Sequence, residues 1–338
     1  MTAPRIPTAP LGLTGMAITR VGFGAWALGG GDWAFSWGPQ DDDVAIAAIR
    51  HAVESGVSWI DTAAVYGLGH SEEVVGRALR DIPAADRPYV FTKGGLVWDD
   101  KDRSVRPRRV GAPESLRREV DASLRRLGVE RIDLYQMHRP AEDGTKLEDY
   151  WRTFVELKAA GKVRAIGLSN HDADQLERAE AIGHVDTLQP AFSAIHRDAA
   201  RDLVPWTTRH ETGVIAYSPM ASGLLTGAFS AERVAALPAD DWRRRSPDFT
   251  TNLAANLAVA EALDAVARRH GVGQPAAAVA WTLAFKGVTG AIVGARSPAQ
   301  VDGWLPAAQL VLTDEDLDEV AAAITASGAG EGPIGPSR

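Results

Sequence analysis

The chain has 338 residues, of which 45% are hydrophobic and 24% charged, and its formal net charge is −8 at pH 7. These proportions are typical of a soluble globular protein with a large core, and they exclude wholesale disorder. Acidic and basic residues are interspersed, so the chain lacks the broad positive surface that holds a nucleic acid or an anionic membrane. Two short basic clusters, 103–109 and 243–245, predict solvated loops first and contacts to a phosphate-bearing ligand second.

Cysteine is absent, which excludes disulfides, thiol nucleophiles and cysteine-ligated metal centres. Residues 1–16 lack the apolar core of a signal peptide, and no run approaches the roughly 18 apolar residues of a membrane span. We therefore expect a cytoplasmic protein with neither a nucleic-acid nor a membrane partner.

Short runs rich in β-forming residues alternate with longer runs of helical periodicity. Eight such strands are expected: 20–26, 58–63, 89–95, 132–139, 163–170, 185–192, 213–219 and 288–295. Parallel neighbours need a crossover, so eight strand–helix units predict an α/β fold, a single-domain (β/α)8 TIM barrel. An open doubly wound sheet is the competing architecture, but Ala27 stands where its G-x-G-x-x-G turn needs the third glycine.

Helices are expected where apolar residues recur at helical spacing behind acidic or capping residues. These runs are 41–56, 70–81, 112–128, 146–162 and 172–183. Gly56, Gly128, Gly161 and Gly183 end four of them, where a C-terminal cap requires a left-handed residue.

We place the barrel at 20–325, with one segment before it, one after it, and one long segment within it that interrupts the strand–helix repeat. Residues 1–19 are expected to form a hairpin that caps one barrel end, and an extra helix and a flexible tail, 326–338, are expected at the C-terminus. Residues 226–255 follow the seventh strand and are rich in Pro, Arg, Asp and Asn. In a barrel this segment lies on the functional face, where long loops act as lids.

Ionisable residues follow three neighbouring strands of the predicted barrel. Asp61 ends the second strand and Tyr66 comes just after it, while Lys93 ends the third and His138 the fourth. Taken singly, they are equally well interpreted as a helix cap, an ordinary aromatic, a surface lysine and a core histidine. Together they indicate chemistry, because an ammonium at the end of an apolar strand costs several kcal/mol unless a carboxylate such as Asp61 pairs with it.

The same grouping predicts proton transfer. A neighbouring ammonium favours phenolate, so we expect Lys93 to lower the pKa of Tyr66 from its ordinary value near 10. Tyr66 is then the expected proton donor and acceptor, and His138 can orient a carbonyl oxygen by hydrogen bonding.

These residues lie in motifs that resemble the aldo-keto reductase family, over about residues 10–325. The pieces that carry the resemblance are GVSWIDTAAVYG, VFTKGG, RRLGVERIDLYQMHRP, GKVRAIGLSN, VIAYSPMASGLLTG and IVGARSPAQV. The chain is most similar to the longer, bacterial-type members, which also resemble potassium-channel beta subunits. The resemblance implies hydride transfer between NAD(P)H and an aldehyde or ketone, or the reverse, with Tyr66 as general acid/base, tuned by Lys93, which Asp61 holds.

The resemblance also implies a set of cofactor contacts. Near the nicotinamide it places Gly24, Ala25, Trp26 and Asp61, with Ser169, Asn170 and Gln189 on the carboxamide and Tyr217 stacked on the ring. Over the pyrophosphate it places a loop that contains Ser218, Pro219, Met220, Gly223, Leu224 and Gly227. At the adenosine half it places Gly294, Arg296, Ser297 and Gln300.

An arginine beside a serine at a helix start suits a 2′-phosphate, so NADP(H) is expected to be preferred, with NAD(H) possible. Trp304 stands where the family usually has Asn, so one adenine contact departs from the pattern.

The substrate is expected to be a small carbonyl compound or alcohol, held by Tyr66 and His138, with Trp33 and Trp37 as apolar walls. The histidines form no H-x-H or H-E-x-x-H pair, so no metal is expected.

Two rival functions stay open at this stage: a cofactor-sensing auxiliary subunit, and a barrel lyase or isomerase that uses Lys93 as a Schiff base. Monomer and homo-oligomer are equally open.

Overall fold

The computed structural model describes residues 6–238 and 241–337. Residues 1–5 of the expected cap, 239–240 of the expected lid and 338 of the expected tail lie outside the described residues. No helix within the described ranges is long and apolar enough to cross a membrane.

Within the described residues, eight parallel strands close into a barrel, each inside a run that the sequence predicted. They are β3 (Val21–Gly24), β4 (Trp59–Asp61), β5 (Tyr89–Gly94), β8 (Ile132–Met137), β9 (Val163–Ser169), β10 (Thr187–Gln189), β11 (Gly213–Ala216) and β12 (Gly290–Gly294). Hydrogen bonding from β12 to β3 closes the ring. The prediction of a (β/α)8 barrel is confirmed.

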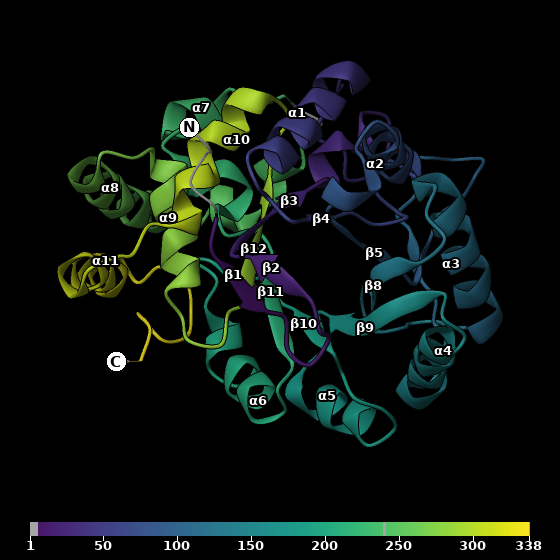
Figure 1. Cartoon of the computed structure of the whole chain (residues 1–338). Helices are drawn as coiled ribbons and strands as arrows, with labels where there is room; N and C mark the ends of the chain where they lie inside the picture. The colour runs from purple at the N-terminus through teal and green to yellow at the C-terminus, as the bar shows by residue number, and fades with distance from the viewer. Residues whose placement is uncertain (1–5, 239–240, 338) are drawn as a thin grey trace.

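Helices surround the strands as an outer ring (Figure 1). The ring contains α1 (Asp42–Glu54), α2 (His70–Arg80), α3 (Pro113–Leu127), α4 (Leu147–Ala159), α5 (Ala173–Glu180), α6 (Leu203–Arg209), α9 (Gln274–Leu283) and α10 (Pro298–Trp304). The expected C-terminal helix is α11 (Asp314–Ser327), which packs on α8 (Leu253–His270). Thr313 begins α11 with a capping box, because its hydroxyl and the Asp316 carboxylate each accept from the other's backbone N–H.

The glycine caps divide into two groups. Gly56, Gly128 and Gly161 have φ angles of +95°, +67° and +76°, as the expected left-handed caps require. The prediction for Gly183 is wrong, because its φ is not positive. A Cβ there would lie 2.7 Å from Cγ2 of Val155, so this glycine instead allows a close approach to α4.

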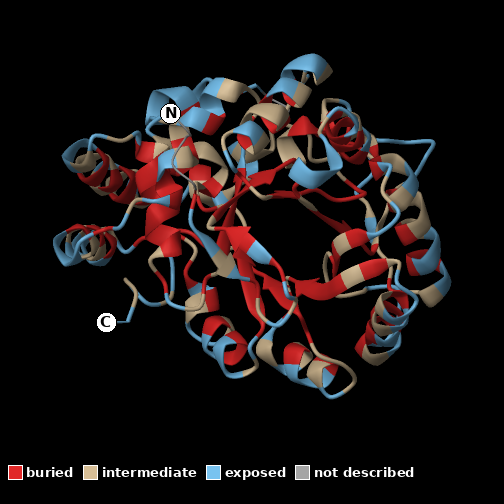
Figure 2. Ribbon diagram, in the orientation of Figure 1, coloured by how far each residue is buried: buried red, intermediate tan, exposed pale blue. Residues whose placement is uncertain are grey.

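The N-terminal hairpin pairs β1 (Thr8–Pro10) with β2 (Ala17–Thr19) in antiparallel register. Leu11, Met16 and Ile18 are buried against the inward-facing side chains of the barrel. Most of the barrel strands are coloured as buried in Figure 2, and Figure 1 shows β1 and β2 across the barrel opening. Leu11 lies against Gly213, the first residue of β11, so the hairpin closes the end at which the strands begin. After α11, the carbonyl of Ala329 accepts from Arg197 at 2.9 Å and Ala329 is only 2% exposed, so the segment expected to be a flexible tail contacts the barrel.

Trp59 fills the barrel interior next to the hairpin. Its side chain is fully buried and its indole N–H donates to the carbonyl of Thr19 at 2.8 Å. A Cβ on Gly22 would lie 2.1 Å from the Trp59 ring, and one on Gly290 would lie 3.0 Å from it. Two neighbouring strands therefore carry glycine because the indole occupies the space of their side chains.

We predict that Gly22→Ala destabilises the protein by about 1–3 kcal/mol, because an added methyl group has no room in a packed interior. Urea unfolding monitored by tryptophan fluorescence measures the change. Gly303→Ala is the control: a Cβ at this position in α10 meets no atom within 4 Å, so it should gain about 0.5–1 kcal/mol from helix propensity. An unchanged stability in Gly22→Ala would contradict the packing argument.

Candidate active site

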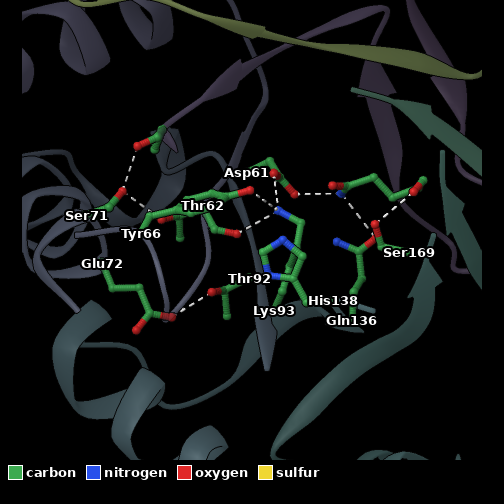
Figure 3. Close-up of polar contacts among 12 residues, drawn as sticks. Asp61, Thr62, Tyr66, Ser71, Glu72, Thr92, Lys93, Gln136, His138 and Ser169 are labelled. Carbon is green, nitrogen blue, oxygen red and sulfur yellow. Dashed lines mark hydrogen bonds and ion pairs between the residues drawn. The ribbon is translucent and has the colours of Figure 1, made fainter. Parts of the chain in front are cut away.

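The predicted catalytic residues meet at the carboxyl end of the barrel. Asp61 ends β4, Lys93 lies near the end of β5 and His138 directly follows β8. Tyr66 lies in the turn after β4, where its N–H donates to the carbonyl of Ala63. Figure 3 shows these four side chains pointing toward one another.

Lys93 is at the centre of the group and is 1% exposed. Its ammonium lies 2.5 Å from Oδ1 of Asp61, 3.0 Å from the carbonyl oxygen of Thr62 and 3.4 Å from the hydroxyl of Tyr66. All three ammonium protons therefore have acceptors, and the expected pairing of Lys93 with Asp61 is present.

A further polar chain supports the carboxylate from the opposite side of the barrel. The Gln189 amide donates to Oδ2 of Asp61 at 3.0 Å and to Oε1 of Gln136 at 3.3 Å. Gln136 was missed in the sequence. The available signal was a glutamine inside the apolar strand IDLYQM, two residues before His138 and therefore on the same inward face.

Charge and burial determine the protonation states. Burial by itself lowers the pKa of Lys93, but the attraction of Asp61 and Tyr66 outweighs it and raises the net value, so Lys93 is an ammonium. Burial also raises the pKa of the Asp61 carboxyl, against the attraction of Lys93. The ionised pair is the form that satisfies the geometry, because both Asp61 oxygens accept hydrogen bonds.

The expected lowering of the Tyr66 pKa is wrong in net direction. Burial raises the pKa of the phenol above its usual value, and the opposing effect of Lys93 is smaller. Tyr66 is therefore a protonated phenol at neutral pH. A sequence supplies the neighbouring charge but not the desolvation, and here the desolvation is larger.

His138 lies edge-on to Tyr66, with 5.7 Å between ring centroids and an interplanar angle of 84°. Burial, together with the positive charges of Lys93 and Arg139, holds the pKa of His138 well below its usual value, so the imidazole is neutral. Its Nδ1 has no hydrogen-bond partner among residues 6–238 and 241–337.

The residues expected around a nicotinamide carboxamide are also brought together. Tyr217 donates to Oδ1 of Asn170 at 2.7 Å, and the Asn170 amide donates to the carbonyl of His138 at 2.9 Å. Ser169 donates from its hydroxyl to the carbonyl of Gln189 at 2.8 Å. These contacts lie on the carboxyl ends of β9, β10 and β11, beside Lys93 and Asp61.

The loop after β11 has an unusual backbone. Ser218, Ala221 and Ser222 have φ angles of +57°, +46° and +56°, although none of them is glycine. Left-handed conformations at such residues cost about 1–3 kcal/mol each and cluster at functional sites. In the same expected contact set, Leu224 is fully buried, so the structure does not expose it to a ligand.

The segment expected to bind the adenosine half is held by the loop after β3. Arg296 donates from Nε to Oε1 of Gln40 at 2.7 Å, and its guanidinium also donates to the carbonyls of Trp37 and Pro39. No carboxylate pairs with Arg296 in the part of the chain that the structure describes. Gln300 accepts from the Arg296 backbone N–H at 2.7 Å, which fixes this turn.

Two further positions clarify this region. Trp304 is 1% exposed, so the residue that departs from the family pattern is part of the core. Arg243 forms an ion pair with Asp241 and lies over the ring of Trp37, so this arginine of the basic cluster is held by a carboxylate and an aromatic ring.

Aromatic rings surround the approach to Tyr66. Trp26 is stacked between Tyr66 and Trp242, with centroid distances of 6.2 and 6.1 Å, and Trp37 contacts Trp26 edge-on at 5.1 Å. Trp242 was missed; its signal was a lone tryptophan in the polar segment 226–255. Trp33 and Trp242 help to line a cleft of about 550 Å³ together with Asp32, Ala34, Ser36 and residues 101–104.

The described ranges contain no cluster of three or more His, Cys, Asp or Glu side chains that could hold a metal ion.

Comparisons with known proteins agree with the geometry. The family model for the aldo/keto reductase family matches residues 20–325. The aldo-keto reductase YhdN of Bacillus subtilis is 33% identical over 309 residues, covering 91% of this chain and 90% of that protein. The NADH-specific methylglyoxal reductase of Escherichia coli is 34% identical over 318 residues, covering 91% of this chain and 95% of that protein.

Solved structures show the same similarity. The glycerol dehydrogenase AKR11B4 from Gluconobacter oxydans superposes with a TM-score of 0.86 at 36% identity, covering 100% of this chain and 99% of that one. An aldo-keto reductase from Bacillus halodurans shares the fold, with a TM-score of 0.74 at 21% identity over 99% of both chains. The family resemblance is confirmed, and this chain belongs to the aldo/keto reductase family of nicotinamide-dependent carbonyl reductases.

Proposed function

We propose that this protein reduces small aldehydes or ketones with NADPH, with Tyr66 as the proton donor. The observation that carries the proposal is the position of the Lys93 ammonium, which contacts Oδ1 of Asp61 and the hydroxyl of Tyr66 beside the neutral ring of His138. The same contacts argue against a Schiff base, because an ion-paired ammonium with three acceptors is not a free amine nucleophile.

The chemistry of the donor set suits a nicotinamide ring. The amide oxygen of Gln189 accepts from no other described residue, so it can accept from a carboxamide, and the half-buried Tyr217 lies beside it. When bound, the cofactor supplies the hydride. Ser169, Asn170, Gln189 and Tyr217 would hold the nicotinamide, and the strained loop from Ser218 would cover the pyrophosphate.

The proton comes from this chain. Because the Tyr66 oxygen accepts from Lys93, its own proton is free to donate to a carbonyl oxygen. The ammonium then stabilises the phenolate that remains, and Asp61 keeps the ammonium in place. The neutral imidazole of His138 donates a second hydrogen bond to the same oxygen, which aligns the carbonyl.

Tyr66→Phe should lower kcat for carbonyl reduction at least a hundredfold, because positioned proton transfer contributes about 10² to 10⁴ in rate. Cofactor affinity, measured by quenching of tryptophan fluorescence, should stay within about twofold, since the ring remains. Tyr89→Phe, at the other end of β5, is the matched control and should keep wild-type turnover. Near-normal turnover in Tyr66→Phe would reject the mechanism.

The pH profile follows from the protonation states. Carbonyl reduction needs protonated Tyr66 and neutral His138, and these forms persist between about pH 6.5 and 10 because the pKa of Tyr66 is raised and that of His138 is lowered. We therefore expect kcat/KM for reduction to be flat in this range, to fall above it as Tyr66 ionises, and to fall well below it as His138 becomes protonated, while alcohol oxidation rises with pH. An inflection near pH 7 in the reduction profile would contradict this assignment.

The preference for NADP(H) rests on Arg296. Its positive charge has only uncharged acceptors among the described residues, and Ser297 caps α10 without a side-chain cap bond, which leaves both groups available to a 2′-phosphate. The relative from Escherichia coli is NADH-specific, so this preference needs a direct test.

Arg296→Ala should weaken NADPH binding roughly tenfold or more and leave NADH binding nearly unchanged, because only NADPH loses a charge-assisted hydrogen bond. Dissociation constants for both cofactors, from fluorescence titration, give the comparison. The exposed Arg268→Ala on α8 serves as the charge control. Equal losses for the two cofactors would reject the phosphate contact.

The proposed substrate site lies between Tyr66, His138 and the surrounding tryptophans. Trp33 is 7% exposed and lines the cleft, whereas Trp37 faces the rings of Trp26 and Trp242. We propose both as apolar walls, with Trp33 nearer the opening. The cleft also contains charged and hydroxyl side chains, so its outer part suits substrates that carry polar groups.

A further inference from the structure

A buried histidine that takes no part in the proposed reaction directly follows the Ser169–Asn170 pair. His171 is 1% exposed, and its Nδ1 lies 2.9 Å from the carbonyl oxygen of Ser169. Its Nε2 lies 2.8 Å from the hydroxyl of Tyr150, a 2% exposed residue on α4. In the sequence, His171 directly precedes the run 172–183, where a helix is expected.

The two contacts determine how the imidazole is protonated. A carbonyl oxygen can only accept, so Nδ1 must carry the proton that it donates to Ser169. Nε2 is then the acceptor for the Tyr150 hydroxyl. Burial lowers the pKa of His171 to about 4, which keeps this neutral form at ordinary pH. His171 therefore connects α4 rigidly to the end of β9.

The carbonyl that His171 holds belongs to the peptide that leads into Asn170. Asn170 has a φ of +61°, a left-handed conformation that is uncommon outside glycine. From this conformation its side chain contacts the hydroxyl of Tyr217, the carbonyl of His138 and the hydroxyl of Ser169. A rotation of the Ser169–Asn170 peptide would displace all three contacts.

We propose that His171 is a positioning residue of the cofactor site: through the Ser169 carbonyl, it holds Asn170 in the orientation that binds the nicotinamide end. The inference rests on the proposed function, because it takes Asn170 and Tyr217 as cofactor contacts. The two halves of the cofactor are supported by different residues. His171 supports the nicotinamide end, whereas the adenosine end lies at Arg296 on another part of the barrel rim.

Two amide substitutions separate the contacts of His171. In His171→Asn, the side-chain N–H takes the place of Nδ1 and still donates to Ser169. In His171→Gln, the longer amide takes the place of Nε2 and keeps only the contact with Tyr150. Both variants are polar and similar in size, so a difference between them reports on the Ser169 contact and not on loss of packing.

The measurement is the dissociation constant of the reduced cofactor that the wild type binds better, and of its fragment without nicotinamide, ADP-ribose or 2′-phospho-ADP-ribose. We expect His171→Gln to bind the whole cofactor roughly tenfold more weakly, the equivalent of one hydrogen bond, and the fragment unchanged. His171→Asn should stay within about twofold of the wild type for both ligands.

Trp151→Phe on α4 is the structural control, because it removes a partly buried hydrogen bond to the carbonyl of Gly183 away from the site. It should lower the stability without changing either dissociation constant. If His171→Gln and His171→Asn bind the whole cofactor equally, or if both ligands weaken in parallel, the positioning role is overturned. A wild-type protein that binds neither cofactor would instead overturn the proposed function.

Discussion

The buried ion pair between Lys93 and Asp61 is the constraint on which the rest of the site depends. An ammonium that is 1% exposed is tolerated only if every proton has an acceptor, and that requirement places Asp61, the Thr62 carbonyl and Tyr66 around it. The second oxygen of Asp61 then needs its own donor, which Gln189 supplies from the other side of the barrel. One buried charge thus fixes groups on β4, β5 and β10 relative to each other.

The barrel supplies this arrangement through the period of two residues along its strands. Side chains two residues apart point to the same face, so each inward-facing apolar residue is followed two positions later by an inward-facing residue nearer the carboxyl end. The apolar residues pack on the N-terminal hairpin, and the polar residues form the site. The pairs are Trp59 and Asp61, Phe91 and Lys93, Leu134 and Gln136, and Ile215 and Tyr217.

Sequence patterns predicted the strands, the barrel and the ion pair, because periodicity and the cost of burying a charge are local or pairwise properties. They failed where three-dimensional packing decides. Gly183, the predicted helix end, lies beyond the end of α5 and allows close contact with Val155 instead of a left-handed cap. The phenol of Tyr66 responds more to burial than to Lys93. Trp242 was missed because only the folded conformation of the segment after β11 brings it onto Trp26.

The fit of Trp59 against Gly22 and Gly290 also bears on how such barrels diverge. The indole occupies the space of two side chains on neighbouring strands, so none of the three positions can change size without the others. A smaller residue at position 59 would open a cavity that methyl groups at positions 22 and 290 could fill. Across related barrels we therefore expect these three positions, distant in the chain, to vary together in compensated steps, independently of any change in substrate.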